Sequence, residues 1–483
     1  MVFSSIIFLF LFLPVTLLVY FPIGKRFRNL FLLAASLFFY AWGETFYVLI
    51  MLASICANYI FGLMIARYGN GTKAKLFLGF AVTANLGLLI VFKYTNFLID
   101  NFNQIFASVL AAPIQIDPVH LPIGISFFTF QAMTYVVDVY RKEAPVQKNP
   151  VNIGLYISLF PQLIAGPIVR YNTVAGQIIS RSINLKDFAE GIERFIFGLG
   201  KKVLIANSVA VAADKIFAIP SEHLTFSLAW MGILCYTLQI YFDFSGYSDM
   251  AIGLGRMFGF TFPENFNYPY LSKSIREFWK RWHISLSTWF RDYLYIPLGG
   301  NKLGTVRTYA NLVTVFFLCG LWHGASWNFV IWGLLHGLFL VLERIGLEKL
   351  LDRIWSPIQY LYTLLVVMTC WVFFRAETLP DALSFIAAMF GFARGDGIIH
   401  HTGLYLDNEI WLTMIAGIIF SAPIFPFIKK TWSTITKNQT GISGNLTEGI
   451  SAISGISSLI LIFLASIMSL AAGAYNPFIY FRF

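Results

Sequence analysis

The sequence predicts an all-α integral membrane protein, and composition and patterning together support that fold class. Of its 483 residues, 58% are hydrophobic and only 12% are charged, and the mean hydropathy is +0.70. An average soluble domain is about 45–50% apolar and about 25% charged. The composition therefore excludes a disordered chain and an ordinary soluble enzyme. At about 20 residues per crossing, the length allows about ten to twelve transmembrane helices.

The apolar residues gather in successive stretches along the chain. These are residues 6–21, 30–42, 46–66, 76–92, 123–139, 153–169, 224–242, 309–321, 329–342, 358–374, 411–427 and 456–472. Several are short or interrupted, as Pro161, Gly166 and Pro167 interrupt residues 153–169. Irregular backbone inside a membrane is tolerated only where protein buries it or water reaches it. We therefore expect a bundle with broken, re-entrant and interfacial helices, and a single polytopic domain over residues 1–483.

Basic residues predict which helix ends share a side of the membrane. The formal net charge is +10, and membrane proteins concentrate Lys and Arg in cytoplasmic loops next to anionic lipids, so nucleic-acid binding is not expected. Basic clusters at 25–26, 67–75 and 141–148 are separated by pairs of apolar stretches. We therefore place all three clusters in the cytoplasm and the N-terminus outside. The first stretch lacks the preceding basic residues of a cleavable signal.

The segment 321–328, Leu-Trp-His-Gly-Ala-Ser-Trp-Asn, joins two apolar stretches and carries the strongest candidate residue, His323. A polar side chain inside a membrane is costly and is a functional candidate by default. A membrane-buried imidazole stays neutral, as a general base must be, although it could instead hydrogen-bond to a neighbouring helix. Trp322, Ser326 and Asn328 are candidate substrate-binding residues in the same segment. His336 would face elsewhere on a continuous helix, unless the chain breaks near Gly324.

A second pattern lies at residues 276–291. On a continuous helix, Arg276, Lys280, His283, Ser287 and Arg291 would share one face, opposite an aromatic face. This predicts a basic amphipathic helix. It could lie on anionic lipid headgroups, or Arg276, Lys280 and the adjacent Arg281 could bind the phosphates of a soluble acyl donor.

Two carboxylates, Asp243 and Asp249, follow an apolar run together with Ser245, Gly246 and Ser248. We expect a helix break there, with an Asp paired to a base such as Arg256 or capping a helix. Both are also candidate substrate-binding residues. No metal site is expected, because no third ligand has suitable spacing and the four cysteines are scattered. Nucleotide-binding and metalloprotease motifs are absent.

Three long motifs resemble the membrane-bound O-acyltransferase (MBOAT) superfamily, and more closely its bacterial alginate O-acetyltransferase branch. They begin at Tyr241, Phe278 and Gly320, with the sequences YFDFSGYSDMAIGLG, FWKRWHISLSTWFRDYLYIPLGG and GLWHGASW, and the ending NPFIYFRF is also similar. The resemblance is dense over residues 120–345, which would form the core carrying the acyltransferase motifs, followed by C-terminal transmembrane helices at 346–483. It implies an MBOAT-type bundle in the bacterial inner membrane, with His323 as the catalytic histidine and His283 as the second motif position.

The resemblance also implies a mechanism and partners. We expect no bound cofactor; acetyl-CoA would be a co-substrate that docks on the cytoplasmic side, at the basic helix. His323 would take the proton of an acceptor hydroxyl from the outer side, with Asn328, Trp322 or backbone N–H groups stabilising the oxyanion. A periplasmic acetyltransferase is the expected partner. Because no segment is long and polar enough to fold as an extracytoplasmic domain, we expect the immediate acceptor to be a hydroxyl on a partner protein or small relay. Its contact would involve the outer ends of the bundle and the 395–408 segment with His400 and His401. The alternatives are a transporter or flippase of an acetylated or lipid-linked sugar, and a non-catalytic scaffold.

Overall fold

The fold is known from a computed structural model that describes residues 1–69, 71–109, 112–393, 395, 397–424, 426–428, 431, 442–473 and 475–477. All regular elements in this part of the chain are helices, as predicted. The first half contains η1 (Phe8–Phe12), α1 (Leu13–Tyr20), η2 (Lys25–Phe27), α2 (Arg28–Ala41), α3 (Val48–Tyr68), α4 (Thr72–Leu89), η3 (Ile90–Tyr94), α5 (Thr95–Ile105), α6 (Ile125–Arg141), α7 (Pro150–Ser158), α8 (Phe160–Leu163), α9 (Tyr171–Ile179), α10 (Leu185–Gly200), η4 (Lys201–Ala206), α11 (Asn207–Phe217) and α12 (Phe226–Met257).

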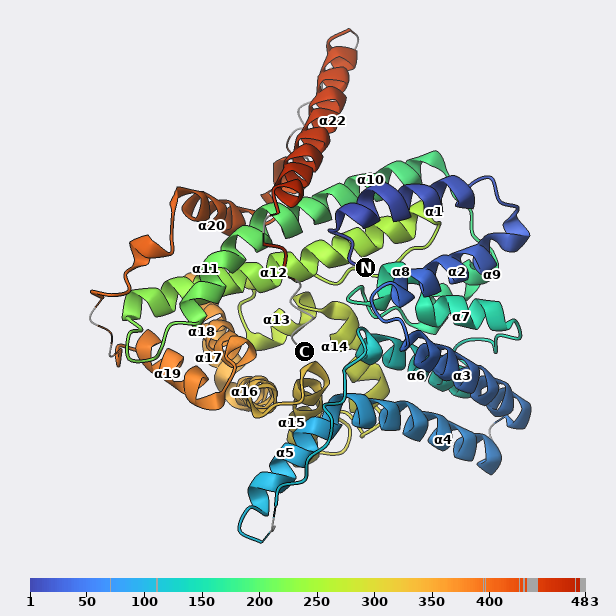
Figure 1. Ribbon diagram of the computed structural model, residues 1–483, viewed down its shortest axis with the longest axis horizontal. Helices are drawn as coiled ribbons and strands as arrows, with labels where there is room; N and C mark the ends of the chain where they lie inside the picture. The colour runs from blue at the N-terminus through green and yellow to red at the C-terminus, as the bar shows by residue number, and fades with distance from the viewer. Residues whose placement is uncertain are drawn as a thin grey trace.

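The second half is made of shorter helices up to the C-terminal one. It contains η5 (Pro269–Leu271), α13 (Ile275–Arg281), α14 (Ile284–Phe290), η6 (Arg291–Tyr295), α15 (Thr305–His323), α16 (Trp327–Leu342), η7 (Glu343–Leu347), α17 (Glu348–Leu351), α18 (Ser356–Arg375), α19 (Leu379–Met389), η8 (Thr402–Leu404), α20 (Asn408–Phe420) and α22 (Ile442–Ala471). Figure 1 shows α13, α14, α15 and α16 grouped around the middle of the molecule, while α22 projects away from the rest.

Six helical segments in the described part are long and apolar enough to cross a membrane. They are Val48–Tyr68, Thr72–Ile105, Leu185–Phe217, Trp327–Leu351, Ser356–Arg375 and Ser451–Ala471. Three shorter apolar helices, Phe8–Tyr20, Leu379–Met389 and Asn408–Phe420, accompany them. The protein is thus a multi-pass membrane protein. To reach ten to twelve crossings, shorter or more polar helices such as α6 and α15 would have to cross as well.

The long helices α10 and α12 pack side by side along one edge of the bundle (Figure 1). Glycines make this close approach possible: a Cβ on Gly198 would lie 2.6 Å from the Gly246 carbonyl oxygen, and one on Gly253 would lie 2.5 Å from that of Gly191. Small residues are the usual contact between membrane helices, because they let backbones approach closely.

Two expectations about helices were wrong. The 185–217 segment was not among the predicted apolar stretches, since Lys201, Lys202 and the acidic residues of α10 interrupt its hydrophobic pattern. The chain does not break at Asp243–Asp249 either, because both lie inside the continuous helix α12. The predicted interruption of residues 153–169 is confirmed, since α7 ends at Ser158 and only the four-residue α8 follows before Gly166.

The two ends of α3 and α6 lie in two different regions of the bundle. At their C-terminal ends, Gly69 and Lys142 line a common depression, so the second and third basic clusters lie together. At their N-terminal ends, the carboxylate of Glu44 accepts a hydrogen bond from the Ile123 backbone N–H (3.1 Å) and lies 3.2 Å from His120 Nε2. The basic clusters and the Glu44–His120 pair therefore lie at opposite ends of these helices.

Residues 475–477 return to the bundle beside the N-terminus. The Asn476 side chain donates to the Ser4 carbonyl oxygen (3.2 Å) and accepts from Asn207 Nδ2 (3.1 Å). The Pro477 carbonyl accepts a hydrogen bond from Lys202. The two ends of the described chain thus meet at η4.

Candidate active site

The site is built around the hairpin of α15 and α16, whose helices cross at glycines. A Cβ on Gly320 would lie 2.3 Å from the Phe329 carbonyl oxygen, and one on Gly333 would lie 2.2 Å from that of Phe316. Helix α15 ends at His323, and the extended residue Gly324 turns the chain before α16 begins at Trp327. The break near Gly324, which the sequence left open, is therefore present, and it places His323 at a helix end between two apolar helices.

His323 is buried, and neither of its ring nitrogens has a hydrogen-bond partner among the residues that the structure describes. Aromatic rings hold the imidazole on several sides: its centroid lies 4.9 Å from those of Trp322 and Trp332 and 5.2 Å from that of Phe374. A buried polar atom without a partner is rare and calls for an explanation. Two such nitrogens on one imidazole leave both the donor and the acceptor of the ring available to a substrate.

His323 and Trp322 line a cavity of about 380 Å³. The other lining residues come from the loop before α6, from the first turn of α6, and from η3 and Ile164; they are Lys93, His120, Leu121, Pro122, Ile123, Gly124, Ile125, Ser126 and Phe127. Because these residues lie at the start of α6, the cavity lies at the end of the bundle opposite the basic clusters at 67–75 and 141–148.

His283 is also buried, and it lies beside Trp322, with ring centroids 6.1 Å apart. Its Nδ1 is 3.2 Å from Asn265 Oδ1, and Phe244 packs edge-on against the ring at 4.6 Å. Its Nε2 has no hydrogen-bond partner among the described residues. Trp322 therefore contacts both histidines of the predicted catalytic pair.

The helix predicted over residues 276–291 is broken in the middle. Trp282 is extended and His283 is left-handed, with φ 44°, so α13 ends at Arg281 and α14 starts at Ile284. The predicted shared face was therefore wrong: His283 points into the core, whereas Arg276 is exposed. The break is held by Asn265, whose backbone oxygen accepts from Ile284 N (3.0 Å) and whose side chain accepts from Ser285 Oγ (2.9 Å).

Among the candidate donor-binding residues, two are engaged in ion pairs. Arg276 pairs with Glu348 at 3.0 Å, and Arg281 pairs with Glu277 at 2.8 Å. Lys280 is exposed and makes no ion pair with a residue that the structure describes. It is therefore the most available cation of α13.

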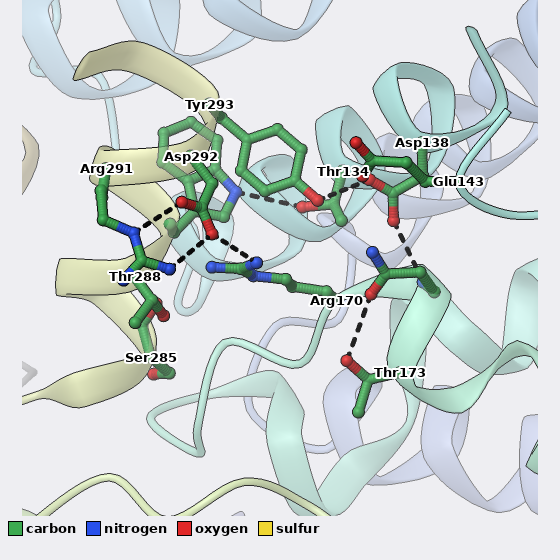
Figure 2. Close-up of polar contacts among 12 residues, drawn as sticks. Thr134, Asp138, Glu143, Arg170, Thr173, Ser285, Thr288, Arg291, Asp292 and Tyr293 are labelled. Atoms are coloured by element: carbon green, nitrogen blue, oxygen red, sulfur yellow. Dashed lines mark hydrogen bonds and ion pairs between the residues drawn. The ribbon is translucent and has the colours of Figure 1, made fainter. Parts of the chain in front are cut away.

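The far end of α14 enters a polar network, drawn in Figure 2. Asp292 lies 2.6 Å from Arg291 and 2.7 Å from Arg170, and the Tyr293 hydroxyl donates to Asp138 at 2.5 Å. Partial burial by itself raises the pKa of Asp292, but hydrogen bonds from Arg291 and Arg170 outweigh it and hold the pKa below its ordinary value. This network ties α14 to α6 and to the loop before α9.

The remaining candidates make structural contacts. Asn328 Nδ2 donates to the Ala376 carbonyl oxygen (2.8 Å), and Ser326 precedes α16 without a side-chain cap. His336 Nδ1 accepts from Trp279 Nε1 (3.2 Å), which matches a packing role. Neither Ser326 nor Asn328 lines the cavity. In the described part of the chain, no group of three or more His, Cys, Asp or Glu residues could hold a metal ion.

Asp243 and Asp249 make ion pairs with a neighbouring helix. Asp243 lies 2.9 Å from Lys202, with both side chains buried, and Asp249 lies 2.6 Å from both Lys201 and Arg194. The expected pairing with Arg256 was wrong, because Arg256 contacts Glu190 instead. Both carboxylates thus join α12 to the segment formed by α10 and η4.

Sequence reasoning missed Lys93 and Tyr94, which contact the end of α15. Lys93 Nζ donates to the carbonyl oxygens of Trp322 (2.5 Å) and His323 (3.1 Å), and the Tyr94 hydroxyl donates to that of Leu321 (2.7 Å). A signal was present, because Lys93 is a charged residue inside the span Thr72–Ile105, and such residues are functional candidates.

The chain is similar to known proteins over much of its length. The model of the membrane-bound O-acyltransferase family, MBOAT, matches residues 36–348. The chain belongs to this family. The matched region contains both histidines, the cavity and η3, so the protein is an O-acyltransferase of the membrane.

Three relatives show how far the similarity extends. A probable alginate O-acetylase AlgI of Pseudomonas putida is 43% identical over 491 residues, covering 100% of both chains. A peptidoglycan O-acetyltransferase of Helicobacter pylori is 36% identical and covers 100% of this chain and 98% of the relative. A teichoic acid D-alanyltransferase of Streptococcus thermophilus is 30% identical but covers only 47% of this chain and 58% of the relative. Similarity over the full length is thus seen with O-acetyl-transferring relatives.

Proposed function

We propose that the protein transfers an acetyl group from acetyl-CoA at the cytoplasmic side to a hydroxyl acceptor at the outer side, for O-acetylation of an alginate-like exopolysaccharide or a cell-wall glycan. The observation that carries this proposal is the imidazole of His323, which is buried beside a cavity and has neither ring nitrogen hydrogen-bonded to a described residue. The O-acetyl-transferring relatives of full length support acetyl as the acyl group and a glycan as the final acceptor.

In the proposed reaction, His323 takes the proton of the acceptor hydroxyl as the oxygen attacks the thioester carbonyl. The new C–O bond forms, the C–S bond breaks, and the imidazolium returns the proton to the leaving thiolate. The cavity at the start of α6 supplies the path for the acceptor, and the basic ends of α3 and α6 mark the donor side. We propose that the enzyme lies in the bacterial inner membrane, with these basic ends in the cytoplasm.

Replacing the base tests the proposal. His323→Gln nearly preserves side-chain volume but removes the imidazole. With an acceptor hydroxyl supplied, release of CoA from labelled acetyl-CoA by purified protein should therefore fall at least about 100-fold, as expected for general-base loss. His336→Gln is the matched control, because it removes a buried imidazole that accepts from Trp279, and it should keep most of the activity. Activity of His323→Gln above about one per cent of wild type would contradict the mechanism. A transporter or scaffold would release no CoA in either case.

We also propose a protein partner at the outer face, a separate extracytoplasmic acetyltransferase that modifies the polymer. The segment around His400, whose ring lies 5.6 Å from that of His223, is the proposed contact. Purified protein in liposomes with acetyl-CoA and oligosaccharide should acetylate the sugar only after the partner is added. Efficient acetylation without the partner would disprove the need for it.

A further inference from the structure

Helix α15 ends inside the protein, where its last carbonyl groups need partners. The final carbonyls of an α-helix have no intrahelical donor, and burying such groups unpaired costs free energy. Gly320 O accepts from Gly324 N at 3.2 Å. The next three carbonyls, those of Leu321, Trp322 and His323, are all served by the side chains of Lys93 and Tyr94.

These two side chains come from η3, a π-helical turn between α4 and α5. A π turn is rare and is found frequently at functional sites. It inserts one extra residue into the helix and so changes which side chains face the neighbouring helix. Here it lets consecutive residues, Lys93 and Tyr94, both reach the end of α15.

All three N–H donors of the Lys93 ammonium have an acceptor. Two are the carbonyl oxygens of Trp322 and His323, and the third is Ser126 Oγ at 3.4 Å. No carboxylate in the described part of the chain pairs with Lys93. The negative end of the α15 dipole is therefore its compensating charge, and the ammonium is engaged with the protein although it lines the cavity.

The orientation of His323 depends on this anchor. Because its ring nitrogens have no hydrogen-bond partner in the described part of the chain, no polar side chain described there fixes the imidazole directly. Its direction follows from the backbone of the last turn of α15 and from the surrounding rings of Trp322, Trp332 and Phe374. A misplacement of about 1 Å at a reacting group can cost about 100-fold in rate.

We propose that Lys93 is a positioning residue for the acyl transfer, which fixes the last turn of α15 through the Trp322 and His323 carbonyls and so aims the His323 imidazole into the cavity. This inference rests on the proposed function. Since Lys93 holds protein atoms rather than substrate, its loss should lower kcat and leave the KM of donor and acceptor nearly unchanged.

The test compares Lys93→Met, Lys93→Arg and Tyr94→Phe in the purified full-length protein. Lys93→Met keeps the length of the side chain but removes its donors, and kcat should fall about 30-fold or more, with both KM values within about threefold of wild type. Lys93→Arg retains a cationic donor and should recover at least a third of wild-type kcat. Tyr94→Phe removes one neutral hydrogen bond to the same helix end and should lower kcat by less than about fivefold.

Hydrogen–deuterium exchange of peptides covering residues 318–328 gives a readout apart from activity. Exchange there should be faster in Lys93→Met than in wild type and close to wild type in Lys93→Arg. An increased acceptor KM with unchanged kcat would overturn the proposal in favour of direct substrate binding. Lower thermal stability with unchanged kcat would also overturn the proposal, because Lys93 would then only stabilise the end of α15. His323→Gln, measured in parallel, reports separately on the proposed function, because full activity of that variant would refute the general base whatever Lys93 does.

Discussion

His283 shows how much a single residue conformation can determine. Its φ of 44° lies in the left-handed region, which costs a non-glycine residue about 1–2 kcal/mol. The backbone and side chain of Asn265 hold this turn. The strained residue places an imidazole beside Trp322, in contact with the same ring that touches His323. Strain of this kind is found preferentially at active sites.

Substitution of His283 separates its backbone role from its chemical role. Asn tolerates the left-handed conformation, so His283→Asn should fold with thermal stability close to wild type and still lose at least about tenfold in CoA release, since the imidazole is gone. His283→Ala should lose activity and also unfold at a lower temperature. Full activity of the Asn variant would show that the imidazole of His283 is not needed for acyl transfer. Thermal unfolding in detergent and the CoA assay provide both measurements.

At the scale of elements, the sequence patterns predicted those turns and interruptions that depend only on residues close together in the chain. The turn between α15 and α16 was predictable from His323-Gly324 between apolar runs, and the interruption after α7 was predictable from Pro161. The break at His283 was not, because it depends on Asn265, 18 positions earlier. The 185–217 span was missed since Lys201 and Lys202 look unfavourable in a membrane until their partners on α12 are known.

The role of helix α13 can be tested at its exposed lysine, Lys280. Because Lys280 makes no ion pair with a described residue while Arg276 and Arg281 do, Lys280→Glu should raise the apparent KM for acetyl-CoA several-fold and leave the acceptor KM unchanged. Lys186→Glu, an exposed reversal at the start of α10, is the control. Equal donor KM in both variants, with poorer membrane insertion of Lys280→Glu, would assign α13 to headgroup binding instead.

At the scale of the whole molecule, the cavity and the basic clusters lie at opposite ends of α3 and α6. This separation suits an enzyme whose two substrates arrive from different sides of a membrane. The sequence predicted that the three basic clusters share one side of the membrane, and the depression lined by Gly69 and Lys142 agrees with this for the second and third clusters. The cavity could not be predicted, because it joins Lys93 and the loop before α6 to a helix more than 190 residues away in the chain.

Cysteine labelling tests this orientation. In a protein with the exposed Cys56 replaced, His120→Cys should react with a membrane-impermeant maleimide added outside intact spheroplasts. Lys142→Cys should react only after the cells are opened, because basic loops stay in the cytoplasm. Labelling of both positions from outside, or the reverse pattern, would refute the proposed donor and acceptor sides.

The buried ion pair between Lys202 and Asp243 also constrains how the chain is made. Lys202 belongs to the span Leu185–Phe217, whereas its partner is on α12, about 40 residues later. At about 5–20 residues per second, the ribosome needs roughly 2–8 s more to synthesise Asp243. During that interval the lysine has no carboxylate from α12, and a charge near the middle of a bilayer is costly. We therefore expect the 185–217 segment to wait beside the insertion machinery and to enter the lipid together with α12, as one co-translational unit.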